Sequence, residues 1–270
     1  MQDPSSSSDD LLVFGAVLAA SGLALVPLAR ATVRHLLRGR VVFFARWGFS
    51  HLTAILLLVL GLLLVARWIV PGSDVVADAW RLVVVLGGAA VAATWLAARV
   101  HPEGVRALGL GPGTGRAVAV ALLAYLILVP VLVGLESVWP SVMELFGIEA
   151  DPAADLVAAF LELEGGALYQ ALLIAVVLGP LVEEVLFRGF LQPLLVQNLG
   201  VRGGIVLTSF LFGLLHPVHA FLPVFGLSLF LGGIQVRTQR LAAAWTVHAA
   251  HNGAVMGVAL AWPAARELIH

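Results

Sequence analysis

The sequence predicts an all-α, polytopic membrane protein with about eight transmembrane helices and a buried intramembrane active site. Of its 270 residues, 61% are hydrophobic and only 11% are charged, whereas soluble globular domains carry about 25% charged residues. Apolar segments long enough to cross a bilayer recur along the chain. One of these segments contains three charged side chains, which membrane helices rarely carry without a functional reason.

Eight segments have the apolar length of a membrane crossing. In chain order they are Leu11–Ala29, Gly48–Val70, Arg81–Val100, Ala117–Trp139, Ala167–Val196, Gly203–His216, Phe221–Gln235 and Leu241–Trp262. The first follows an acidic N-terminus instead of the positive flank of a signal peptide, so we expect it to be retained. The sixth and seventh are short for a straight crossing. They could form one broken or re-entrant unit around Pro217, which other helices would have to cover.

Arginine placement predicts the orientation of these segments, because cytoplasmic loops carry an excess of basic residues. Most arginines fall in loops on one side of the predicted bundle. They are Arg30, Arg34, Arg38, Arg40, Arg46, Arg99, Arg106, Arg116, Arg202, Arg237 and Arg240. We therefore predict a multi-pass protein of the cell membrane in which these loops face the cytoplasm, with membrane lipid as its surroundings.

Composition excludes several kinds of site. The net charge of −1 gives no indication of a nucleic-acid partner. The chain has no cysteine, which excludes disulfides, zinc sites built from thiolates and a cysteine nucleophile.

The fifth segment holds Glu183, Glu184 and Arg188. Glu184 and Arg188 are four residues apart with the acid first, which is the favourable order for a helical ion pair. Adjacent residues point about 100° apart on a helix, so we expect Glu183 to face elsewhere as a free carboxylate. The alternative is a purely structural network of the three charges that holds helices together.

Two later segments place polar side chains at helical spacing. Phe212 and His216 are four residues apart, and so are His248 and Asn252. At 1.5 Å per residue, Glu183 lies about 20 Å from the cytoplasmic end of its segment, and His248 and Asn252 lie about 10–17 Å in. His216 reaches a similar depth. These groups are therefore predicted to meet in the cytoplasmic half of the membrane or near its midplane.

This set of side chains contains what water-driven amide cleavage needs. A desolvated carboxylate can act as a general base, and a histidine can help to hold and deprotonate the water. A second histidine and an asparagine amide can donate hydrogen bonds to a developing oxyanion. Other intramembrane hydrolase sites fit less well, because no Asp follows Asp155, Ser228 lacks the second glycine of the usual serine-protease turn, and no His-Glu-x-x-His stretch occurs.

The three motifs Glu183-Glu184-x-x-x-Arg188, Phe212-x-x-x-His216 and His248-x-x-x-Asn252 resemble those of the CAAX-protease and bacteriocin-processing intramembrane proteases, also called CPBP or ABI proteins, which include the type II CAAX prenyl endopeptidases. The resemblance covers about Ala167–Ala261. It implies an eight-helix membrane fold with the site below the membrane surface. It also implies that Glu183 and His216 activate water while His248 and Asn252 stabilise the oxyanion, with Glu184, Arg188 and Phe212 in supporting positions.

On this basis the chain divides into three parts. Residues 1–166 supply N-terminal transmembrane helices with cytoplasmic Arg-rich loops, residues 167–262 form the catalytic core and residues 263–270 form a C-terminal tail. The expected substrate is a CAAX-like or small membrane-associated peptide, with or without a lipid group. The alternatives are a non-catalytic scaffold or immunity factor of the same fold, or a transporter. A transporter is less well supported, because the two halves of the sequence show no paired repeats or matching broken helices.

The sequence also leaves open whether the site binds a metal ion. The family is often labelled metalloprotease, although the chemistry above requires no cofactor. If zinc is present, Glu183, His216 and His248 are its predicted ligands. The pairs His216/His219 and His248/His251 also have His-x-x-His spacing, but Pro217 interrupts the first of them.

Overall fold

The computed structural model describes residues 45–111, 114–148, 159–160 and 162–261, together with scattered residues between 13 and 27. Over these residues the fold is helical, without strands. Five helical stretches are long and apolar enough to cross a membrane: Phe49–Ile69, Val75–Val100, Thr114–Leu145, Gly165–Leu214 and Val218–Thr238. The described part of the chain is therefore all-helical with five candidate membrane spans, and the expected number of eight spans is not reached in it. The expected first span, Leu11–Ala29, lies largely outside them.

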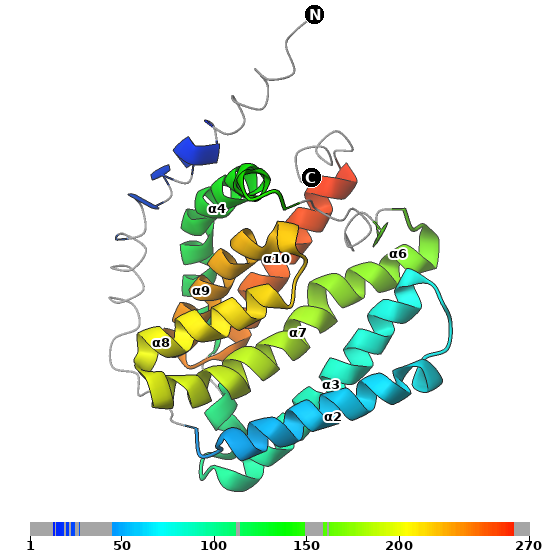
Figure 1. Cartoon of the computed structure of the whole chain (residues 1–270). Helices are drawn as coiled ribbons and strands as arrows, with labels where there is room; N and C mark the ends of the chain where they lie inside the picture. The colour runs from blue at the N-terminus through cyan, green and yellow to red at the C-terminus, as the bar shows by residue number, and fades with distance from the viewer. Residues whose placement is uncertain are drawn as a thin grey trace, which may run out of the picture.

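Helices α2 (Phe49–Ile69) and α3 (Val75–Val100) form a hairpin at one side of the bundle (Figure 1). Helix α3 begins earlier than expected because the Asp74 carboxylate caps it by accepting a hydrogen bond from the Ala77 amide. Small residues of α3, such as Ala89 and Ala93, are fully buried and allow close packing against η4. Large side chains of α2 point outward, with Leu64 74% and Trp68 88% exposed, which suits contact with lipid.

Helix α4 (Thr114–Leu145) continues past the expected end at Trp139 although Pro130 and Pro140 lie inside it. It packs against α9 and α10 through a core that includes Ala117 and Ala121. Before it, the short helix η1 (Gly104–Leu108) ends at Gly109, whose φ of 85° suits a glycine. The N-terminal helices and the C-terminal helices thus share common hydrophobic cores.

The expected fifth and sixth spans form one long helical stretch with a sharp break at Gly200, where φ is 74° and ψ is 170°. The stretch consists of α6 (Gly165–Leu172), η3 (Leu173–Leu178), α7 (Gly179–Glu184), η4 (Val185–Leu191) and α8 (Gln192–Leu214). Both η3 and η4 are π-helical, so the helix containing the two glutamates is wound loosely on each side of them.

The last helices complete the bundle. A 3₁₀ turn, η5 (Val218–Ala220), leads from the end of α8 into α9 (Phe221–Thr238). Gln239, in a left-handed conformation with φ of 50°, ends α9, and α10 (Leu241–Ala261) follows. Helix α10 covers the eighth expected span but is not among the five most apolar stretches, since it carries two histidines and an asparagine. It lies between α4, α9 and the long stretch through α7 (Figure 1).

Candidate active site

A buried ion pair lies at the centre of the candidate site. One carboxylate oxygen of Glu184, Oε2, is 3.3 Å from Arg188 Nε, and both side chains are completely buried. The guanidinium also donates to Ser228 Oγ at 3.0 Å, and its carbon lies 4.9 Å from the centre of the Phe212 ring. Glu184 and Arg188 thus join the long helix to α8 and α9, as expected for two groups that can enter an apolar interior only together.

His248 lies between the two glutamates. Its Nδ1 is 3.0 Å from Glu184 Oε1, and its Nε2 is 3.8 Å from Glu183 Oε2. Glu183 does not share the direction of Glu184 toward Arg188, and the two glutamates point to opposite nitrogens of the same imidazole ring. They differ in exposure, because the side chain of Glu183 is 20% exposed while that of Glu184 is 0% exposed.

His216 and Phe212 approach this centre from the end of α8. His216 Nδ1 donates to the Phe212 carbonyl oxygen at 2.8 Å, which leaves Nε2 with the free lone pair in the neutral ring. The Phe212 ring lies 4.7 Å from the His216 ring and 5.8 Å from the His248 ring, measured between centroids. Phe212 therefore contacts both histidine rings and also covers Arg188.

Asn252 is oriented by the backbone of the long helix. Its amide nitrogen donates to the Ala175 carbonyl oxygen, in the π-helical segment η3, at 2.9 Å. One turn of α10 separates it from His248, so both side chains lie on the same face of the helix. His251 points to α4, where its Nδ1 is 3.0 Å from the Tyr125 hydroxyl.

The structure thus brings Glu183, Glu184, Arg188 and His248 into one cluster, with Phe212 and His216 at its edge. Asn252 is placed by a separate contact with η3. Sequence reasoning missed the partner of Arg188 on α9, Ser228, although a serine in an apolar helix signals a buried hydrogen bond.

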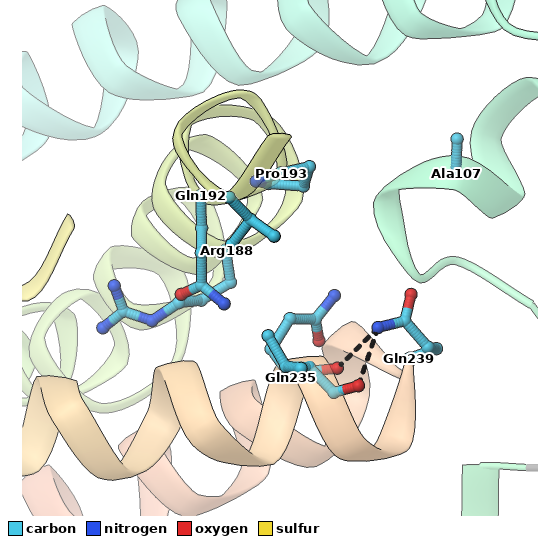
Figure 2. A pocket seen from close by; sticks show the side chains of 8 residues that line it. Ala107, Arg188, Gln192, Pro193, Gln235 and Gln239 are labelled. Atoms are coloured by element: carbon cyan, nitrogen blue, oxygen red, sulfur yellow. Dashed lines mark hydrogen bonds between the residues drawn. The ribbon is translucent and has the colours of Figure 1, made fainter. Parts of the chain in front are cut away.

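A small polar pocket lies beside Arg188, between η1, the first turn of α8 and the end of α9 (Figure 2). Gln192 extends next to Arg188 and donates to the Gly232 carbonyl oxygen at 3.0 Å. On the opposite wall, Gln239 donates to the backbone of the last turn of α9. Glu183, His216, His248 and Asn252 do not line this pocket, so it is not the place where a substrate would meet them.

The predicted zinc ligands do not form a metal centre. A zinc site needs three or four ligand atoms arranged about one point, each about 2.0–2.2 Å from it. Over the part of the chain that the structure describes, no group of three or more His, Asp or Glu side chains is arranged in this way. Glu183 and His248 face each other at 3.8 Å, and His216 Nδ1 is turned to the Phe212 carbonyl oxygen. We therefore derive no chemical step from a metal.

The comparison with protein families agrees with the three motifs. Residues 166–254, about a third of the chain, match the model of a family described as type II CAAX prenyl endopeptidase Rce1-like. The matched residues run from α6 into α10 and contain every candidate site residue. No curated protein and no solved structure matches the chain. The resemblance inferred from the motifs is therefore confirmed over residues 166–254, a segment that is similar to the Rce1-like type II CAAX prenyl endopeptidases.

Proposed function

We propose that this protein is an intramembrane endopeptidase in which Glu183 is the general base. The difference between the two adjacent glutamates carries the proposal. Glu184 is fully buried and held by Arg188 and His248, so it has no freedom to take up a proton from a substrate water. Glu183 is partly exposed, and its contact with His248 is too long for a hydrogen bond.

The proposed reaction begins with a water held between Glu183 and His216. The lone pair of His216 Nε2 orients the water, and Glu183 takes its proton as the oxygen attacks the carbonyl carbon of the scissile peptide bond. Glu183 then delivers that proton to the leaving nitrogen as the bond breaks. The second proton of the water passes through His216 Nε2 to the same nitrogen, so the products are a carboxylate and an ammonium group, and Glu183 and His216 return to their starting states.

The oxyanion of the intermediate is stabilised by His248 and Asn252. His248 Nδ1 is held by Glu184 at 3.0 Å, whereas its Nε2 makes no short hydrogen bond with Glu183, so we assign Nε2 as the nitrogen that donates to the oxyanion. Asn252 uses one amide hydrogen on Ala175 and retains a second one. Oxyanion donors of this type contribute roughly 10²–10³ in rate.

We propose as the substrate a peptide with a membrane-associated C-terminus, either CAAX-like and lipidated or a small membrane-associated peptide. The reaction would take place in the cytoplasmic half of the cell membrane or near its midplane. The apolar outer face of the bundle supports access from lipid, since α2 and α3 expose many large apolar side chains. The Rce1-like match supports the substrate class.

The test is direct cleavage. Purified protein in lipid vesicles is incubated with a prenylated CAAX peptide, with its unprenylated form and with a scrambled sequence, and products are identified by mass spectrometry. We expect cleavage of the prenylated peptide by wild-type protein and none by the Glu183→Gln variant. Absence of cleavage of all three peptides by folded wild-type protein would favour the scaffold or transporter alternatives.

A further inference from the structure

The two π-helical segments that flank α7 receive hydrogen bonds from distant parts of the chain. A change between α and π spacing releases backbone carbonyls from their usual helical partners, and a buried carbonyl needs another donor. Asn252 Nδ2 donates to Ala175 O at 2.9 Å, and Trp245 Nε1 donates to Val177 O at 3.2 Å, both in η3. Trp47 Nε1 donates to Phe190 O in η4 at 2.8 Å.

Two of these donors lie on α10 and bracket His248. Trp245, His248 and Asn252 are three and four residues apart, so they share one face of the helix. The outer two contact η3, whereas His248 meets the glutamates of α7. The position of the imidazole between two carboxylates is thus determined by where α10 is attached to η3.

The contacts of His248 with the two glutamates are sensitive to small movements of α10. A shift of α10 by one residue is a movement of about 1.5 Å along its axis. Such a shift is half the 3.0 Å separation between His248 Nδ1 and Glu184 Oε1, so it would disturb this contact. It would also move His248 Nε2, the proposed oxyanion donor, relative to Glu183.

We propose that Trp245 and Asn252 clamp α10 onto the released carbonyls of η3, and that Trp245 is a positioning residue for His248. The clamp follows from the contacts alone, and its role in turnover rests on the function proposed above. Asn252 also belongs to the proposed oxyanion site, so Trp245 is the residue through which the clamp can be tested separately.

The activity test compares two tryptophans that differ in the segment they contact. Trp245→Phe removes the indole N–H that donates to η3. Trp47→Phe removes an indole N–H that donates to η4 instead, from a residue outside α10. We expect kcat to fall about tenfold in Trp245→Phe with little change in KM, within the ~10²-fold that a misplacement of about 1 Å costs. Trp47→Phe should retain kcat and lose only stability.

A second measurement is independent of activity. Because the chain has no cysteine, cysteines can be placed at Tyr169 on α6 and Val258 on α10, which are 73% and 48% exposed, and spin-labelled. We expect Trp245→Phe to shift or broaden the distance distribution between the labels, and Trp47→Phe to leave it unchanged. Trp245→Tyr, which also lacks the indole N–H, repeats the test if the Phe variant does not accumulate.

The outcomes separate the clamp from the proposed function. A distance distribution that is the same in wild type and Trp245→Phe overturns the clamp, whether or not the protein cleaves a peptide. A shifted distribution with unchanged kcat overturns the positioning role. If Trp245→Phe shifts the distance distribution but wild-type protein never cleaves a peptide, the protease proposal is refuted and the clamp remains supported.

Discussion

Replacing either of the adjacent glutamates by glutamine removes one charge and almost no volume, yet we expect opposite consequences. In Glu184→Gln the guanidinium of Arg188 stays buried without its carboxylate, and His248 loses its nearest charge. Breaking a buried pair in this way costs about 3–5 kcal/mol. In Glu183→Gln the lost contact is a 3.8 Å approach at a partly exposed side chain, for which roughly 0–1 kcal/mol is expected.

Cleavage activity should be affected in the opposite order, most strongly by Glu183→Gln. Loss of the general base in Glu183→Gln is expected to lower kcat by about 10²–10⁴ while the protein remains folded. The measurements are unfolding of the purified variants, followed by tryptophan fluorescence, and peptide cleavage by the fraction that is folded. Normalising to that fraction separates a loss of chemistry from a loss of protein.

A double variant tests the physical cause. If Glu184→Gln is unstable because Arg188 keeps an uncompensated charge, then adding Arg188→Gln should restore part of the lost stability. Equal stability of the two single glutamate variants, or a double variant that is no more stable than Glu184→Gln, would refute this division of roles.

Three further predictions follow from the structure and the sequence. Single cysteines in the loops 30–46 and 99–116 should resist an impermeant external reagent in intact cells; labelling there would invert the predicted topology. Activity should survive strong chelation, and His248→Ala should act mainly on kcat; loss of activity on chelation that zinc restores would contradict this prediction. Gly204→Ala should lower stability by about 1–3 kcal/mol in thermal scans because its Cβ would lie 2.6 Å from the preceding arm of α8. Gly233→Ala, which meets nothing within 4 Å, is the matched control and should not be destabilised.

The positions of most helices could be predicted from the sequence because lipid demands long apolar segments. The ends were less predictable. Helix α3 starts at Val75, before the expected Arg81, because Asp74 supplies a cap that an apolar window does not register. Helix α4 passes through Pro140, since a proline removes only one helical hydrogen bond and tertiary contacts can compensate for it.

The contacts of the candidate site also differ in whether the sequence could predict them. The pairing of Glu184 with Arg188 follows from local helical spacing and could be predicted. The contact of His248 with both glutamates depends on how α10 docks on α7, which no local pattern specifies. The π-helical segments next to α7 break the 3.6-residue period on which predictions of facing residues rest, and so Ala175 and Val177 were not expected to receive side-chain hydrogen bonds.

The polar residues that make α10 a poor membrane helix are the ones that attach it to the bundle. A polar side chain in lipid is costly unless a partner satisfies it. Here His248 contacts Glu184, Asn252 contacts the backbone of η3, and His251 contacts the Tyr125 hydroxyl of α4. Because each contact reaches a different neighbouring element, α10 is fixed from several sides, and the same contacts that satisfy its polar side chains hold the imidazole of His248 near Glu183.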